Sequence, residues 1–305
     1  MAFRSVIGID ENGLGPRMGP LVVTGVRLRL DGRGPTLEEL RRATGLDDSK
    51  RVFSPAHRDR GEARALGVLG PRSATSLPAL LRRLSVPPPW PAPPACPEPE
   101  RARSGSCPAL DPGRPLPRWI AAPDDLAAPL AQLGVQVERI ATAAVCPGVL
   151  NEALRAESSK LQVDLQLFET VGAALLDGAG TPPELVCGKV GGTERYAARF
   201  RAWGRRPMRT IGESRACSTY EIEGVGRVSF VRDADATEPA VAIASVIGKY
   251  VRELWMDDLA ASVGWTEATP SGYHDERTAR LLRHVRDRIA AGTSPLPAGC
   301  VERLR

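Results

Sequence analysis

The segment that decides the fold is Gly8-Ile9-Asp10-Glu11-Asn12-Gly13-Leu14-Gly15-Pro16, which ends an apolar run starting at residue 3. The run predicts a buried β-strand over residues 3–11, and the Asn-Gly pair predicts the turn that stops it. Two carboxylates at the end of such a strand are costly to bury unless they are neutralised or coordinated. Neighbouring strand residues face opposite ways, but the break would allow Asp10 and Glu11 to approach one cation. A solvated strand end is the alternative interpretation.

A second acidic segment, residues 232–239, stands before an apolar stretch that predicts a helix over residues 239–259. Asp235 would lie at the end of a strand, just before that helix. Helix capping is its alternative role, because Asp is a favoured N-cap residue. Acids at the ends of separate strands are a way to build a site for a hard divalent cation into a sheet.

The remaining patterns predict a mixed-sheet α/β domain. Further strands are expected at 21–30, 135–145, 183–190, 218–223 and 227–232, and further helices at 37–44, 76–84, 151–176, 194–203 and 278–291. We expect residues 1–305 to form one domain. Residues 87–117 are Pro-rich and poor in apolar side chains, so this stretch is interpreted as a disordered insertion.

Composition sets broader limits. The chain of 305 residues has a net charge of +5, which suits a polyanionic partner such as nucleic acid. Its six cysteines are widely spaced and form no C-x-x-C pair, which argues against a zinc site or a disulfide scaffold. No apolar stretch reaches the roughly 18 residues of a membrane span. We therefore expect a reduced, cytoplasmic, monomeric protein that does not enter membranes.

The opening segment resembles the G-I-D-E-x-G-x-G-P signature of the type 2 ribonucleases H. In this resemblance Asp10 and Glu11 take the first two acidic positions, and Gly13-Leu14-Gly15 takes the turn whose backbone reads the ribose 2′-hydroxyl. Three further elements follow in the family's order. They are Asp48-Ser49-Lys50, then Asp235 with Ser245, Lys249 and Arg252 in register behind it, then Gly272-Tyr273.

The resemblance implies a ribonuclease H-like fold, a mixed central sheet flanked by helices. It also implies Mg²⁺ or Mn²⁺ as cofactor, with Asp10, Glu11 and Asp235 as metal ligands and catalytic residues. The tyrosine would stack beside the sugar at the scissile junction. The implied nucleic-acid-binding residues are Gly13, Leu14, Gly15, Ser49, Lys50, Lys249, Arg252 and Tyr273.

The chain departs from the family pattern in two places. Leu14 stands where the family has an arginine that contacts phosphate. The third acid is also missing, because the strand at 183–190 carries Cys187 or Gly188 at that position, depending on register. Glycine has no side-chain ligand, and a thiolate prefers softer metals than Mg²⁺.

Two acids are candidates to replace the missing one. Asp233 would share a strand face with Asp235 if the strand is regular, and Glu213 is the other candidate. Solvent exposure is the alternative role for both. Lys189 raises a different hypothesis, in which its ammonium neutralises Asp10 or Asp235 in place of a metal.

Three functions remain open from the sequence. The first is a metal-dependent endoribonuclease with weakened activity, acting on RNA in RNA–DNA hybrids or at ribonucleotides in duplex DNA. The second is a degenerate family member that binds nucleic acid without cutting it. The third is a structural α/β protein whose basic surface only aids solubility.

Overall fold

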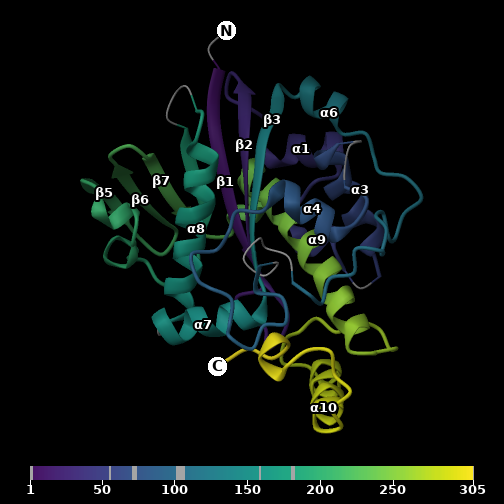
Figure 1. The fold of residues 1–305 in the computed structure, drawn as a ribbon. Helices are drawn as coiled ribbons and strands as arrows, with labels where there is room; N and C mark the ends of the chain where they lie inside the picture. The colour runs from purple at the N-terminus through teal and green to yellow at the C-terminus, as the bar shows by residue number, and fades with distance from the viewer. Residues whose placement is uncertain are drawn as a thin grey trace.

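The computed structural model describes residues 3–54, 56–70, 74–100, 107–157, 159–179 and 183–304. Its centre is a seven-stranded mixed sheet with the order β3-β2-β1-β4-β7-β6-β5 (Figure 1). The strands are β1 Phe3–Asn12, β2 Leu21–Asp31, β3 Val135–Val145, β4 Glu184–Gly188, β5 Met208–Glu213, β6 Cys217–Ile222 and β7 Gly226–Val231. β4 runs parallel to β1 on one side and to β7 on the other, and the remaining pairs are antiparallel.

Helices cover both faces of this sheet. The described α-helices are α1 Leu37–Thr44, α2 Ser49–Val52, α3 Arg58–Leu69, α4 Leu77–Leu84, α6 Ala127–Gln132, α7 Pro147–Glu157, α8 Lys160–Leu176, α9 Pro239–Ser262 and α10 Glu276–Ala290. Short 3₁₀ turns lie at η1 Ala197–Arg199, η2 Trp203–Arg205, η3 Ala234–Ala236 and η4 Ala298–Cys300. The mixed-sheet α/β class expected from the sequence is confirmed.

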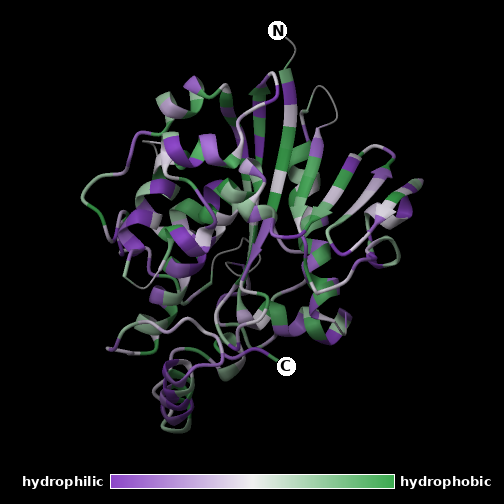
Figure 2. Cartoon of the chain, turned by 180° about the vertical axis from the view of Figure 1, so that it is seen from behind, coloured by the Kyte–Doolittle hydropathy of each residue, from purple (hydrophilic) through white to green (hydrophobic). Residues whose placement is uncertain are grey.

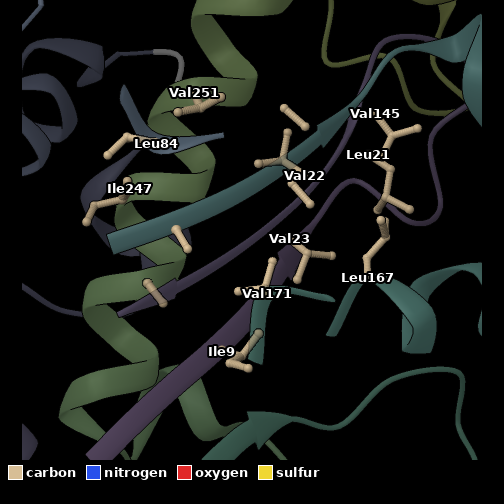
Figure 3. Packing of buried hydrophobic residues seen from close by; sticks show 14 of the residues in the cluster. Ile9, Leu21, Val22, Val23, Leu84, Val145, Leu167, Val171, Ile247 and Val251 are labelled. Atoms are coloured by element: carbon tan, nitrogen blue, oxygen red, sulfur yellow. The ribbon is translucent and has the colours of Figure 1, made fainter. Parts of the chain in front are cut away.

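The core lies on either side of β1 and β2. On one face α8 packs on the sheet, with Val171 close to Ile9 and Val23, and on the other face α9 contributes Ile247 and Val251 (Figure 3). Apolar residues concentrate in the central strands, whereas the peripheral α10 is mainly hydrophilic (Figure 2). α9 is buried over most of its length because it lies between the sheet and α1–α4.

Two predicted helices differ from the structure, and four of the described helices and strands, α6 among them, were not predicted. The helix expected at 151–176 is two helices, α7 and α8, and Ser159 in extended conformation precedes the second. The helix expected at 194–203 is wrong, since only η1 and η2 form there. The buried Glu169 carboxylate accepts the backbone N–H groups of residues 201–203, which holds this stretch as a loop. The helices α2 and α3 and the edge strand β5 were not predicted.

The Pro-rich stretch also differs from its prediction. Its described residues, 87–100 and 107–117, form no strand of their own, as expected, but they are not independent of the core. Trp90, Cys107 and Leu110 are buried, and the backbone N–H of Leu116 donates to Thr75. The prediction of disorder is therefore wrong for these residues, because a few apolar anchors are enough to dock the segment. Residues 101–106 lie outside the described part.

The closest approach between helix and sheet occurs at Gly8. A Cβ at this position would lie under 3.0 Å from the backbone of Ala240 and Val241 in α9. Gly8→Ala should therefore push α9 away from β1 and lower the free energy of unfolding by about 3 kcal/mol, measured by denaturant titration. Gly212→Ala is the matched control, since no atom lies within 4 Å of its Cβ position, and it should change stability by about 0.5 kcal/mol or less. Equal effects of the two changes would contradict the close contact.

Candidate active site

Three neighbouring strands bring the acidic segments together at their carboxyl ends. We call this end of the central strands, with Asp10, Glu11 and Asp235, the acidic edge. Asp10 lies near the end of β1, Gly188 ends β4, and Asp235 lies in η3, shortly after β7. Because β1, β4 and β7 are parallel, their carboxyl ends meet at the same edge. Asp10 lies on β1, and Asp235 follows β7, so β4 lies between the two strands that bring these acids together.

Asp10 is the most perturbed of these acids. It faces α9, where the Ser245 hydroxyl forms a hydrogen bond with it. Ser245 in turn shares a hydrogen bond of 2.9 Å with Ser49. Burial, together with the nearby charges of Glu11 and Asp235, raises the pKa of Asp10 to about 8. The carboxyl group is therefore largely protonated near neutral pH unless a cation is bound beside it.

Glu11 turns toward the loop that follows the strand. Its Oε2 accepts the backbone N–H of Leu14 at 3.0 Å, which closes the turn after β1. Burial raises the pKa of Glu11, while the Leu14 amide and the charges of Arg252 and Arg303 oppose that rise. The carboxylate is thus half-buried between its own turn and two buried guanidinium groups.

Asp235 does not cap the following helix, because the N-cap residue of α9 is Glu238. Its Oδ2 instead lies 3.6 Å from the ammonium of Lys50, an exposed side chain at the start of α2. Burial and the neighbouring Asp48 raise the pKa of Asp235, and the Lys50 charge counters them. The Asp-Ser-Lys element of the sequence therefore lies directly against the acidic edge.

Gly188 occupies the position of the missing acid. A Cβ built there would lie 2.5 Å from Oδ1 of Asp10, so this residue, and not Cys187, faces the cluster. The Cys187 side chain is fully buried, and burial raises its thiol pKa far above the usual range. A neutral core thiol is a poor ligand for any hard cation.

The proposed replacements do not reach this position. β7 ends at Val231, so Asp233 follows a turn with φ 54° and does not share a strand face with Asp235. Its exposed carboxylate pairs with Arg232 at 3.5 Å. Glu213 lies on β5, the far edge of the sheet, and accepts the Tyr220 hydroxyl at 2.6 Å. The Lys189 ammonium points to the Ser214 carbonyl, so Lys50 is the cation that meets Asp235.

Sequence reasoning missed Asp164, in the first half of α8. Its side chain is fully buried, and neither carboxylate oxygen has a hydrogen-bond partner among the described residues. Burial raises its pKa well above the usual range, and the charges of Glu11 and Asp10 add to the rise. A single acid within the apolar period Val163-Asp164-Leu165 was the available signal.

The turn after β1 is built on two buried arginines. Arg303, also missed from the sequence, donates to the carbonyls of Gly13 and Gly19, and burial lowers its pKa to about 9. Arg252 lies under the same turn, where a Cβ on Gly13 would clash with its guanidinium. Its Nη2 donates to the Ser271 carbonyl at 2.9 Å, which links the turn to the Gly-Tyr segment.

The other predicted contact residues are divided between this turn and the surface. Tyr273 is 47% exposed, and its ring lies 3.5 Å from the Cβ position of Gly15, so it stands beside the Gly-x-Gly turn. Lys249 instead pairs with Glu253 one turn along α9, at 2.7 Å.

A cavity of about 580 Å³ lies between the start of β1 and α6 and contains none of the acids named above. Within the described ranges, no group of three or more His, Cys, Asp or Glu side chains is arranged so that it could hold a metal ion. The donor set nevertheless fits a hard cation, because Asp10, Glu11, Asp235 and the unpartnered Asp164 all offer carboxylate oxygens.

The family model described as ribonuclease HII matches residues 210–292, which include Asp235, Ser245, Arg252 and Tyr273. This match covers less than a third of the chain, which therefore resembles the ribonuclease HII family over that stretch. The matched stretch excludes Asp10 and Glu11, so the metal-ligand roles of these residues remain predictions. No curated protein matches the chain in sequence.

Solved structures of ribonucleases HII, HIII and H2 align with this chain. Bst-RNase HIII in complex with Mn²⁺ aligns with a TM-score of 0.54 and 15% identity, over 99% of this chain and 66% of that one. RNase HII in its complex with PCNA from Archaeoglobus fulgidus has a TM-score of 0.49 and 20% identity, with 98% and 96% covered. The ribonuclease H2 from Pyrococcus horikoshii OT3 aligns with a TM-score of 0.47 and 17% identity, over 97% of this chain and 92% of that one. At these identities the likeness concerns the fold alone. No helix in the described part of this ribonuclease HII relative could cross a membrane.

The raised pKa of Asp10 predicts a pH-dependent stability. Folded Asp10 holds its proton up to about pH 8, whereas in the unfolded chain it ionises near its ordinary pKa of 3.8. Its contribution to stability is therefore greatest below that ordinary pKa and is lost as the pH rises toward 8. In EDTA, Asp10→Asn should raise the melting temperature by about 2–4 °C at alkaline pH and much less near pH 5.

Asp233→Asn serves as the control for this measurement, because its carboxylate is exposed. It should leave the melting temperature unchanged at both pH values. Saturating Mn²⁺ should narrow the difference in melting temperature between wild type and Asp10→Asn, because a bound cation offsets the repulsion that Asp10 contributes. A uniform effect of Asp10→Asn across this pH range would show that Asp10 is not ionising within the cluster.

Proposed function

We propose that this ribonuclease HII relative is a metal-dependent endoribonuclease with weak activity. Its substrate would be RNA in RNA–DNA hybrids or ribonucleotides within duplex DNA. The observation that carries the proposal is the gathering of Asp10, Glu11 and Asp235 at the carboxyl ends of the central strands, where the charges of Glu11 and Asp235 both act on Asp10. The match of residues 210–292 to the ribonuclease HII model supports the reaction class, and the Mn²⁺ bound in Bst-RNase HIII supports the cofactor class.

Asp10, Glu11 and Asp235 would hold the cation, which is Mg²⁺ or Mn²⁺ in this proposal. Such a cation, when bound, activates water and stabilises the leaving 3′-oxygen of a phosphodiester. Asp10 must release its proton to act as a ligand, and the hydrogen bond from Ser245 helps by stabilising the carboxylate. Lys50 must move away from Asp235 or share its carboxylate with the cation, and its long exposed side chain allows either.

Selection for a ribonucleotide would fall to the turn after β1. The backbone at Gly13 and Gly15 carries no side chain that could block a 2′-hydroxyl, and the exposed Tyr273 ring stands beside Gly15. The 2′-hydroxyl is what distinguishes RNA from DNA at a given site. Arg252 and Arg303 support this turn from below, so their role is to position it.

Asp164 is our candidate for the missing third acid. The acid lost from β4 leaves Gly188, and α8 brings a fully buried carboxylate with two unpartnered oxygens close to Glu11. An isolated buried carboxylate is costly, and a nearby cation would offset that cost. We propose that Asp164 completes the donor set from the opposite face of the sheet.

Binding without cleavage is the second candidate function. Two observations favour it: Gly188 cannot replace the lost carboxylate, and the Lys50 ammonium already pairs with Asp235 at 3.6 Å. A site whose charges are neutralised by lysine would still bind a polyanion but would lack the cation that the reaction needs. The cleavage experiment separates the two functions.

A duplex carrying one ribonucleotide tests the enzyme proposal, with Mg²⁺ and with Mn²⁺. Wild type should cleave slowly, and Asp10→Asn should abolish cleavage, which rules out a contaminating nuclease. Gly188→Asp should raise the rate by about tenfold, or about 1.4 kcal/mol of barrier, because it returns a carboxylate beside Asp10. Cys187→Asp is the matched control, since its side chain enters the core and should give no gain. Salt-sensitive duplex binding without cleavage by any variant would favour the binding function.

The role of Asp164 can be tested in the same assay. Asp164→Asn should reduce the cleavage rate at least tenfold, the effect expected from losing a metal ligand, while raising stability in EDTA because a buried charge is removed. Adding Gly188→Asp to Asp164→Asn should restore the rate, because the carboxylate then comes from β4. If Asp164→Asn leaves both the rate and the Mn²⁺ affinity unchanged, Asp164 is not a ligand.

A further inference from the structure

Residues 299–304, which we call the support segment, are bonded to the turn after β1. The two stretches are far apart in the sequence, yet Met18 and Glu302 form an antiparallel β-bridge. Beside this bridge, the backbone N–H of Arg303 donates to the Arg17 carbonyl at 2.8 Å. The support segment and the turn are thus joined directly through their backbones.

The Arg303 side chain extends this contact along the turn. It is 4% exposed, and its Nε donates to the Gly19 carbonyl at 2.6 Å while its Nη1 donates to the Gly13 carbonyl. Because Gly13 begins the turn and Gly19 lies near its end, one guanidinium group ties both parts together. A lysine ammonium could not reproduce these two bonds in the same geometry, since only the guanidinium offers its N–H groups as a rigid planar fork.

The bond to Gly13 also reaches the acidic edge. In a trans peptide unit the C=O and the N–H point in opposite directions. The unit whose Gly13 carbonyl accepts from Arg303 therefore directs its Leu14 N–H the other way, and this N–H donates to Glu11 Oε2 at 3.0 Å. A single peptide unit thus lies between the Arg303 guanidinium and the Glu11 carboxylate, so a shift of Arg303 would move the turn and disturb the carboxylate.

The turn is also bonded to the segment that carries Tyr273. The backbone N–H of Arg17 donates to the Gly272 carbonyl at 2.7 Å, and a Cβ on Gly272 would lie 2.8 Å from the Met18 carbonyl oxygen. Arg17 therefore bonds to the Tyr273 segment through its N–H and to the support segment through its C=O. The surface beside Gly15, where the Tyr273 ring stands, depends on both segments.

One buried side chain of α7 fixes the support segment in turn. Asn151 is 4% exposed, and its Nδ2 donates to the Gly299 carbonyl at 3.1 Å and to the Glu302 carbonyl at 3.0 Å. Its Oδ1 accepts the backbone N–H of Leu304 at 2.7 Å. Three hydrogen bonds from one buried amide hold the segment firmly, because displacing the segment would leave the polar atoms of that amide without partners.

We propose that the support segment determines how well this chain selects a ribonucleotide, with Arg303 as the positioning residue and Asn151 as the residue that holds the segment in place. The inference rests on the proposed function, in which the turn at Gly13 and Gly15 reads the 2′-hydroxyl of a nucleic-acid duplex. Neither Arg303 nor Asn151 contacts the substrate. They act through the backbone of the turn, because a site keeps its geometry to within about 0.5 Å only when packing and hydrogen bonds lock the groups behind it.

Duplex binding in EDTA tests the inference without the reaction. The probes are a DNA duplex that carries one ribonucleotide and the same duplex without it. Wild type should bind the first more tightly, and Arg303→Met should reduce this preference by about three- to tenfold, the worth of one hydrogen bond. Arg303→Lys should recover only part of the preference, since it keeps the charge and loses the paired bonds to Gly13 and Gly19.

Arg27→Met is the matched control for these variants. Arg27, in the second half of β2, also donates to two backbone carbonyls, those of Leu175 and Asp177. Its replacement should lower stability without changing the ribonucleotide preference. A loss of preference in Arg27→Met as large as that in Arg303→Met would show a general effect of stability and would overturn the inference.

Amide hydrogen exchange without nucleic acid gives a second readout, and Asn151→Ala is the variant for it because the turn itself stays unaltered. Exchange at Leu14 and Arg17 should become about threefold faster or more, while exchange in the central strands stays as in wild type. Unchanged exchange at the turn, or a full ribonucleotide preference in both Asn151→Ala and Arg303→Met, would overturn the inference and leave the proposed function standing. A wild type without any preference would instead contradict the ribose selection in the proposed function, and the inference with it.

Discussion

The backbone contact between α9 and β1 is the constraint on which the rest of the structure depends. Gly8 on β1 lets the start of α9 lie directly on the strand. Further along α9, Gly248 allows a similar close approach to Asn12 and Thr24. This contact sets the height of Ser245 above Asp10 and the position of Arg252 under the turn after β1. The acidic edge is therefore positioned by a packing contact that contains no catalytic group.

The electrostatics of that edge oppose the stability of the fold. Asp10, Glu11, Asp164 and Asp235 all have raised pKa values, with burial as the largest cause in each case. Packing alone gives no reason to keep four poorly compensated acids together, because each buried carboxylate costs free energy unless it is paired. Strain of this kind is typical of sites that bind a charged partner.

Two regions far apart in the sequence support the site from outside. The Arg303 guanidinium reaches the turn after β1 from the end of the chain, and the C-terminal segment is itself held by Asn151 of α7. The Pro-rich segment, which looks dispensable by composition, is docked on the core by the buried side chains of Trp90 and Leu110.

Much of the fold was determined by local sequence. The strand at 135–145 was predicted with its observed bounds, and the α9 helix within a few residues, because their apolar patterns match a strand and a buried helix. The acids at the strand ends were predictable in the same way. The loop at 194–203 was not, since it depends on Glu169 from another helix. Asp164 was hidden within an apolar helix pattern.

The residue that faces Asp10 in place of the third acid was decided only by the tertiary structure. Gly188, and not Cys187, faces Asp10 because of the strand register between β4 and β1, which no local pattern specifies. The sequence determines which side chains are available and which local elements they sit on. Long-range packing decides which of them share one charge environment, because that depends on contacts between residues distant in the chain.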